Sequence, residues 1–340
     1  MTAVAAAPGP APASVDVPGP DADLAVVTHG LTKTYGDVEA VADVEMRIGR
    51  GEIVGLLGPN GSGKTTLIRM LSTLLRPTSG HALVGGFDIR KQSAEVRRCI
   101  GLTGQFAAVD EFLTGRENIR LMGRLAGMSA HQATARANEL LSSFGLEDSA
   151  DRHLSTYSGG MRRRLDLALS LTGRPDIVFL DEPTTGLDPR SRFAMWEVIE
   201  SLVADGTTVL LCTQYLEEAD RLAQRVVILD EGRVVAEGPP GDLRQQVGGI
   251  VVELDLHDPE QRNHAIAVLA PIATSPITGE MGDRHLRVPV VNAEQLASVV
   301  RLLDRASIPF HALALHEPTL DDVFLALTGH ATKIIAKDTL

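Results

Sequence analysis

One eight-residue segment constrains the fold of this 340-residue chain more than any other. It runs Gly58-Pro59-Asn60-Gly61-Ser62-Gly63-Lys64-Thr65 and matches the pattern G-x-x-x-x-G-K-[ST]. An apolar strand-like run, 52–57, precedes it, and a helix-like segment, 64–75, follows it. This strand–loop–helix context predicts a phosphate-binding loop in an α/β domain.

The residue types in this segment explain how it would bind phosphate. Its glycines allow backbone N–H groups to turn toward phosphate oxygens, and the following helix adds the positive end of its dipole. We expect Lys64 to reach the β- and γ-phosphates and Thr65 to hold Mg²⁺, with Thr66 beside them in the nucleotide site.

Two adjacent carboxylates follow a second apolar strand, 177–180. At the carboxyl end of a parallel strand, Asp181 and Glu182 would face the phosphate loop. Asp181 suits Mg²⁺ coordination through water, and Glu182 suits a general base that polarises the attacking water. Taken alone, the pair is also compatible with an exposed acidic turn.

A second possible phosphate cradle lies between these motifs. It is formed by Ser158, Gly159 and Gly160 at the start of a helix. Because one nucleotide rarely needs two cradles from one chain, this motif suggests a composite site, in which the phosphate loop of one chain faces the Ser-Gly-Gly of another.

The chain divides into an expected tail at 1–24, an α/β domain at 25–245, a smaller α+β domain at 246–330 and a tail at 331–340. Strands alternate with helices in the first domain, which favours a parallel sheet. The expected helices of that domain are 64–75, 116–126, 130–144, 159–172, 189–204 and 215–222. After the turn-forming residues at 238–241, the expected elements are strand 250–256, helix 259–270, strand 285–290, helix 293–305, strand 310–315 and helix 319–328.

Composition excludes several classes of protein. The net charge of −12 argues against a nucleic-acid partner. Cys99 and Cys212 lie far apart in apolar runs, so we expect buried free thiols and no disulfide framework. No apolar run approaches the ~18 residues that span a bilayer, so any membrane role is expected to be peripheral.

The ordered set of motifs resembles the ATP-binding subunits of ABC transporters over residues 25–245. This resemblance implies a mixed sheet with a helical subdomain, ATP and Mg²⁺ as cofactors, and a homodimer that closes around two ATP molecules. It implies that Tyr35 stacks on adenine, although a plain turn tyrosine is the alternative. It further implies that Gln105 senses Mg²⁺ and that Asp188, in Gly186-Leu187-Asp188, lies in the loop that crosses the dimer interface.

Two positions depart from the family pattern. The segment Tyr157-Ser158-Gly159-Gly160-Met161 resembles the family signature, usually Leu-Ser-Gly-Gly-Gln, but ends in Met161 instead of glutamine. The basic run 162–164 follows, which we interpret as a solvated helix face. Gln214 stands where the family usually has the switch histidine. A glutamine can donate a hydrogen bond to the γ-phosphate but cannot carry a positive charge. A polar cap at a strand end is the alternative role for Gln214.

With these two departures, the chain resembles the daunorubicin-resistance branch of exporter ATPases. The C-terminal motif Leu320-Asp321-Asp322-Val323-Phe324-Leu325 is also similar to a motif of that branch. In that branch the C-terminal module is regulatory and aids assembly, although the motif also fits ordinary helix packing. The resemblance implies an ATPase at the cytoplasmic face of the membrane that drives drug export through a separate multi-span permease. Export of lipid or polysaccharide, and a non-transport ABC ATPase, are the alternatives.

Overall fold

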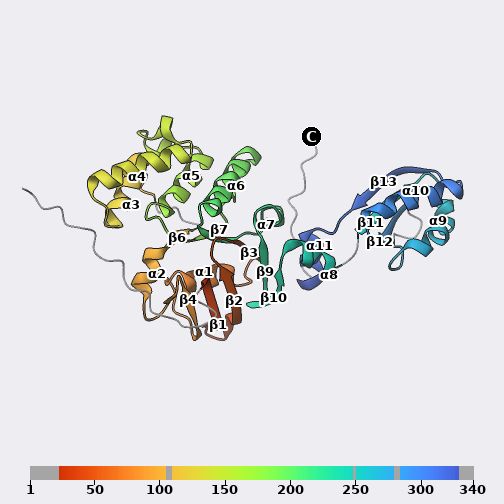
Figure 1. Cartoon of the computed structure of the whole chain (residues 1–340), viewed down its shortest axis with the longest axis horizontal. Helices are drawn as coiled ribbons and strands as arrows, with labels where there is room; N and C mark the ends of the chain where they lie inside the picture. Colours follow the sequence, from red (N-terminus) through yellow and green to blue (C-terminus); the bar gives the residue numbers. More distant parts are fainter. Residues whose placement is uncertain (1–22, 105–108, 248–249, 279–283, 329–340) are drawn as a thin grey trace, which may run out of the picture. The chain divides into compact units, whose positions relative to one another are not determined.

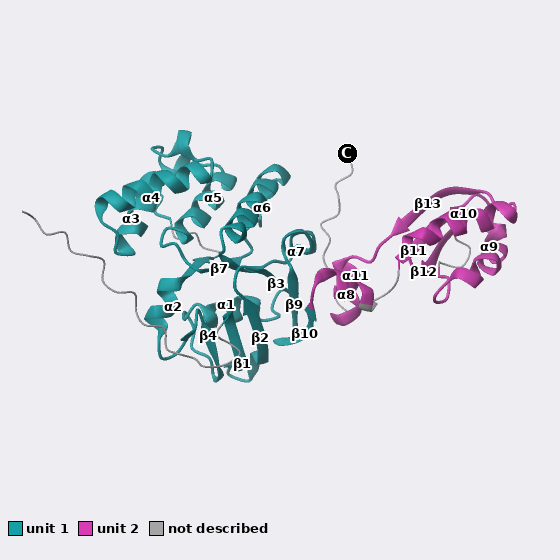
Figure 2. Cartoon of the chain, viewed as in Figure 1, with its two compact units in different colours: residues 1–237 teal, residues 238–340 magenta. Residues whose placement is uncertain are grey.

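The computed structural model describes residues 23–104, 109–247, 250–278 and 284–328. The chain forms two compact units, 1–237 and 238–340 (Figure 2). The expected tails at 1–24 and 331–340 lie outside the described residues, apart from Asp23 and Leu24, the second of which begins the first strand.

The first unit contains two sheets. An antiparallel sheet has the strand order β2-β1-β4-β5 and a six-stranded sheet has the order β10-β9-β3-β8-β7-β6 (Figure 1). The strands of the first are β1 (Leu24–Tyr35), β2 (Val38–Gly49), β4 (Ser79–Val84) and β5 (Phe87–Asp88). Those of the second are β3 (Ile53–Leu57), β6 (Ile100–Thr103), β7 (Ile177–Asp181), β8 (Thr208–Cys212), β9 (Arg225–Asp230) and β10 (Arg233–Gly238).

The centre of the six-stranded sheet is parallel, as the sequence predicts. Strands β6, β7, β8, β3 and β9 pair in parallel with their neighbours in this order. All residues of β3, β7 and β8 are buried, which explains why they are continuous apolar runs without alternation. Their carboxyl ends therefore lie side by side at one edge of the sheet.

Helices complete this unit. Their bounds are α1 (Lys64–Leu71), α2 (Ser93–Cys99), α3 (Gly115–Leu125), α4 (Ala130–Ser143), α5 (Gly159–Ser170), α6 (Pro189–Ala204) and α7 (Leu216–Leu222). Helices α3, α4 and α5 pack together as a helical part of the unit (Figure 1). Helix α1 packs in the main core with residues of both sheets, such as Val44 and Phe179.

The second unit is a small α+β domain. Its strands β11 (Ile250–Leu256), β12 (His285–Val290) and β13 (Phe310–His316) form an antiparallel sheet in the order β12-β11-β13. The core of the sheet is covered by α9 (Arg262–Leu269) and α10 (Leu296–Arg305), which contribute Leu269 and Leu303. Helices α8 (Pro240–Val247) and α11 (Leu320–Thr328) pack against each other.

The boundary between the units differs from the sequence-based one. The sequence analysis places it after residue 245, whereas the chain divides after Glu237. Helix α8 accounts for the difference, because it begins at Pro240, where proline at a first helical position is tolerated, and belongs with α11. Within the described residues, no helix has the length and apolar character needed to span a membrane.

Candidate functional site

The predicted phosphate loop joins β3 to α1, and two of its glycines are needed by its geometry. A Cβ atom on Gly58 would lie 2.2 Å from the carbonyl oxygen of Leu229. Gly63, the residue before α1, has φ +106°, and its Cβ would lie 2.4 Å from the carbonyl oxygen of Ala40. The loop can take this shape only with glycine at both positions.

The polar side chains of the loop fit a phosphate group. Lys64 is 6% exposed, and its Nζ donates to the carbonyl oxygens of Gly58 and Pro59 at 2.7 and 2.9 Å. Burial lowers the pKa of Lys64, and the groups at the ends of β7 and β8 oppose this shift. The Oγ atom of Ser62 is buried and has no hydrogen-bond partner among the described residues. A buried ammonium and an unpartnered hydroxyl in a glycine-rich loop suit an anionic ligand.

Asp181 ends β7 close to the loop. It is 4% exposed, and burial raises the pKa of its carboxyl, while the Thr65 hydroxyl and the Lys64 ammonium oppose this shift. The structure thus brings together the hydroxyl and the carboxylate that the sequence analysis assigns to Mg²⁺. Both are hard oxygen ligands that suit this ion.

Glu182 is held in an unusual backbone conformation directly after β7. Its φ of +51° lies in the left-handed region, which is uncommon for a residue with a side chain. Its N–H donates to the carbonyl oxygen of Cys212 at 2.9 Å, and the Thr185 hydroxyl donates to its Oε2 at 3.0 Å. Such strain persists only where the surroundings fix it, and it is often found at active sites.

Gln214 follows β8, which lies between β3 and β7 in the sheet. The turn before it is fixed, because the Thr213 hydroxyl accepts a 3.0 Å hydrogen bond from the N–H of Tyr215. Lys64, Gln214 and Glu182 therefore follow the carboxyl ends of β3, β8 and β7, three consecutive parallel strands, and lie at one edge of the sheet. This is the place where α/β sheets bind their ligands.

Tyr35 lies at the end of β1 and is 48% exposed. The Nζ of Lys33 lies 5.1 Å from the centroid of its ring, as in a cation–π contact. An exposed ring is compatible with stacking on a base, but adenine stacking stays a prediction. Gln105 lies outside the described residues.

The second cradle begins α5. The Oγ of Ser158 caps the helix by accepting the N–H of Met161 at 3.3 Å. A Cβ on Gly160 would lie 2.8 Å from the Oγ of Ser191, which itself donates to Oδ1 of Asp188 at 2.5 Å. The structure therefore brings the Ser-Gly-Gly segment and Asp188 together at the N-terminal ends of α5 and α6.

The basic run after Met161 is wrongly interpreted as a solvated face. The Arg163 side chain is only 17% exposed and donates to several backbone carbonyls. Arg164 Nη1 donates to the carbonyl oxygen of Phe144 at 2.9 Å. Arg162 is more exposed, at 39%, and pairs with Glu111. The sequence does not predict these arginine–carbonyl contacts, because helical periodicity does not show which backbone carbonyls of other segments lie beside the helix.

Both cysteines are free, as expected. Cys212 is fully buried, whereas Cys99 is only half-buried. Burial raises the pKa of the Cys99 thiol to about 11, so this side chain is protonated at neutral pH.

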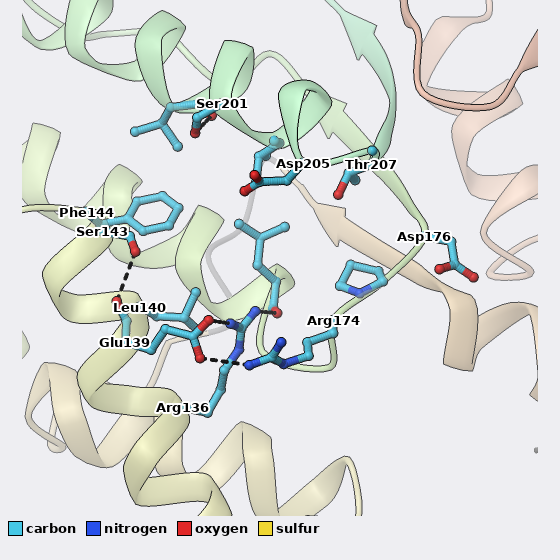
Figure 3. A pocket seen from close by; sticks show the side chains of 15 residues that line it. Arg136, Glu139, Leu140, Ser143, Phe144, Arg174, Asp176, Ser201, Asp205 and Thr207 are labelled. Carbon is cyan, nitrogen blue, oxygen red and sulfur yellow. Dashed lines mark hydrogen bonds and ion pairs between the residues drawn. The ribbon is translucent and has the colours of Figure 1, made fainter.

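A separate pocket lies between α4, the end of α5 and α6 (Figure 3). Its charged groups pair with one another, since Glu139 accepts from Arg136 at 2.5 Å and from Arg174 at 2.9 Å. Arg136 also donates to the carbonyl oxygen of Leu171 at 2.6 Å. The contacts of Arg174 with Glu139 and of Arg136 with Leu171 join α4 to the segment between α5 and β7. The pocket shares no lining residue with the site at the strand ends.

In the C-terminal motif, Leu320, Val323 and Phe324 are buried. Thr319 and Asp322 cap the helix reciprocally, because the Thr319 N–H donates to Oδ2 of Asp322 at 2.9 Å and its hydroxyl accepts the Asp322 N–H. Much of this motif thus has a packing role.

The strand–loop–helix, the carboxylate pair at the end of β7 and the Ser-Gly-Gly helix define a nucleotide-binding ATPase cassette. The ABC transporter family model matches residues 41–185. The chain is 50% identical over 317 residues to the daunorubicin resistance ATP-binding protein DrrA3 of Streptomyces coeruleorubidus, covering 92% of this chain and 98% of the relative. The chain belongs to the ABC transporter family and is an ABC-type ATPase.

Further relatives and solved structures agree with this assignment. The daunorubicin/doxorubicin resistance ATP-binding protein DrrA of Streptomyces peucetius is 48% identical, covering 90% of this chain and 93% of the relative. The Nod factor export ATP-binding protein I of Paraburkholderia xenovorans is 40% identical, covering 90% and 98%. The dimeric cassette MJ0796 bound to ADP and Pi is 30% identical with a TM-score of 0.58, covering 63% of this chain and 98% of that structure.

Proposed function

We propose that this chain is the ATP-hydrolysing subunit of an exporter of drug-like hydrophobic compounds, and that it acts through a separate multi-span permease at the cytoplasmic face of the membrane. The observation that carries the ATPase part is the convergence of Lys64, which follows β3, with Asp181 and Glu182 at the end of β7, two strands that flank β8 in the sheet. The drug assignment is supported by the names of relatives that share up to half of its residues.

The residues have distinct roles in this proposal. MgATP supplies the phosphoryl group that is transferred to water. Lys64 and the loop N–H groups bind the phosphates, with Ser62 and the remaining loop residues around them. Thr65 and Asp181 would hold Mg²⁺, together with Gln105. Their hydroxyl, carboxylate and amide oxygens are the type of donor that this ion requires.

Glu182 is the proposed general base. The 3.0 Å hydrogen bond from Thr185 and the fixed backbone orient its carboxylate, which accepts the proton of the attacking water. Gln214 donates a hydrogen bond to the γ-phosphate but adds no charge. We therefore expect less stabilisation of the transition state from this position than a protonated histidine would give.

We propose that two copies of the chain close around two nucleotides. In the closed dimer, Ser158, Gly159 and Gly160 of one protomer face the phosphate loop of the other, and Asp188 lies at the interface. The similar cassette MJ0796 is a dimer in two solved structures, which supports this arrangement. The first two turns of α5 present a capped, glycine-containing N-terminus that suits an anion.

The proposed cargo can be tested by measuring how much drug cells accumulate. Cells that express the chain with its permease should accumulate less of a fluorescent anthracycline than cells that express the Glu182→Gln variant with the same permease. Equal accumulation would reject drug export. A second cargo is supported by the 40% identity to the Nod factor export ATP-binding protein I, and labelled Nod factor in the same assay would reveal it.

A further inference from the structure

Arg163 makes an unusual set of contacts from the second turn of α5. Its Nε donates to the carbonyl oxygen of Pro183 at 2.7 Å, and its Nη1 donates to that of Gly104 at 3.1 Å. Its Nη2 donates to the carbonyl oxygen of Asp181 at 3.1 Å and also to that of Glu182. One side chain thus binds three successive carbonyls of the turn that carries the proposed base.

The guanidinium is itself held in place. Oδ2 of Asp166, one turn further along α5 and only 4% exposed, lies 3.6 Å from Nη1 of Arg163. All three guanidinium nitrogens donate, and the planar fork fixes the directions of these bonds. A lysine at this position keeps the charge but has one nitrogen, which cannot reach carbonyls in three directions.

These contacts join two functional segments. Helix α5 begins at Ser158 and the two glycines, which the proposed function places against the nucleotide of the other protomer. The turn after β7 contains Glu182, whose backbone has φ +51°. Because the Glu182 backbone is fixed by Arg163 at its carbonyl and by Cys212 at its N–H, a displacement of α5 acts directly on the orientation of the base.

We propose that Arg163 is a positioning residue that couples the Ser158–Gly160 end of α5 to the Glu182 turn, and so links the two composite nucleotide sites of the dimer through each protomer. The inference rests on the proposed function, because it needs the composite site. Through Arg163, a nucleotide that is held by the other protomer and contacts α5 would affect the orientation of Glu182, the base that serves the protomer's own nucleotide.

The test compares two lysine variants on the same helix in the purified full-length chain. Arg163→Lys removes the fork, and Arg162→Lys is the matched control, because Arg162 is 39% exposed and pairs with Glu111. Turnover is measured against ATP concentration to separate kcat from KM. ATP-driven dimerisation is measured separately by light scattering, with each lysine variant placed in the Glu182→Gln background.

We expect Arg163→Lys to lower kcat by about ten- to a hundred-fold, the effect of a small misplacement of a reacting group, while KM stays near its wild-type value. In the Glu182→Gln background, it should still dimerise with ATP, because the cap of Ser158 on Met161 is intact. Arg162→Lys should match the wild type in both assays.

Two results would overturn the inference. One is equal kcat in the Arg163→Lys and Arg162→Lys variants. The other is loss of dimerisation and thermal stability together with turnover, which would assign Arg163 to the general fold. The parent Glu182→Gln chain distinguishes a failure of the proposed function: if it does not dimerise with ATP, or hydrolyses ATP at the wild-type rate, the composite site or the base is wrong.

Discussion

The indole N–H of Trp196 donates a 3.0 Å hydrogen bond to Oε1 of Glu218, and both side chains are buried. This pair joins α6 to α7, next to the strand ends that carry the site. Burial raises the pKa of Glu218, and the nearby hydroxyls of Thr213 and Thr184 oppose this shift. Oε2 of Glu218 has no hydrogen-bond partner among the described residues. Glu218 thus lies between the loops that carry Gln214 and Glu182.

Removal of this carboxyl should destabilise the fold. Glu218→Ala leaves a buried indole N–H unpaired, and we expect the free energy of unfolding to fall by about 1–3 kcal/mol. The measurement is urea denaturation followed by fluorescence, since Trp196 is the one tryptophan in the chain. Glu217→Ala is the control, because Glu217 is 71% exposed on the same helix. Equal stability of the two variants would contradict the role of the pair.

The same pair predicts a dependence of stability on pH. Burial raises the pKa of Glu218, so the folded state holds this proton to higher pH than the unfolded chain does. The wild type therefore loses stability as the pH rises from the unfolded-state pKa, about 4.3, through the higher folded-state pKa, whereas Glu218→Gln does not. The difference in melting temperature, variant minus wild type, should be larger above this interval than below it. A difference that does not change with pH would contradict the buried carboxyl.

Glu182→Gln should separate binding from hydrolysis. The amide keeps the shape of the side chain but cannot accept the proton of water, so we expect kcat to fall by about 10²–10⁴. ATP binding, measured by equilibrium dialysis, should persist, and the closed dimer should accumulate. Turnover at the wild-type rate would show that another group is the base.

We expect Lys64 and Gln214 to contribute unequally to the rate of ATP hydrolysis. Lys64→Ala removes a buried charge inside the phosphate loop, whereas Gln214→Ala removes a neutral donor. Turnover should therefore fall less in the Gln214 variant than in the Lys64 variant, in ATPase assays at saturating nucleotide. Equal losses would show that glutamine carries the full role of a switch residue.

The phosphate loop offers a matched pair of glycine variants. A Cβ on Gly63 would lie 2.4 Å from the carbonyl oxygen of Ala40, whereas a Cβ on Gly61 would meet no atom within 4 Å. Both residues have positive φ, so Gly61→Ala should cost about 1–2 kcal/mol from backbone strain alone. Gly63→Ala should cost more and abolish ATP binding. Comparable stability and binding in the two variants would contradict the observed loop packing.

Strong patterns in the sequence predicted much of the fold. The apolar run before Asp181 and the glycine-rich loop predicted β7 and the turn from β3 into α1, because buried parallel strands and phosphate loops have distinct sequence patterns. Helix α1 was expected to reach residue 75, since Leu74 and Leu75 continue its apolar period. It ends at Leu71 because Thr73 takes a left-handed conformation, φ +64°, which periodicity does not reveal.

Other features depend on tertiary contacts and leave little local signal. Helix α2 has only seven residues and was not expected, because one buried side chain, Val96, creates no periodic pattern. Helix α8 begins at Pro240, inside a Gly-Pro-Pro-Gly run that indicated a linker, yet it packs on α11. The contacts of Arg163 are with carbonyls at the end of β7 and in the turn after it, those of Asp181 and Pro183, which are not its neighbours in sequence.

If this ATPase drives a separate permease, the two proteins should co-purify from the membrane. The tagged Glu182→Gln chain is isolated from native membranes with MgATP, and the proteins that co-elute are identified by mass spectrometry. The account predicts a multi-span membrane protein in an amount equal to that of the ATPase. Recovery in the soluble fraction alone, with ribosomes, nucleic acid or no partner, would contradict the exporter and indicate a non-transport ATPase.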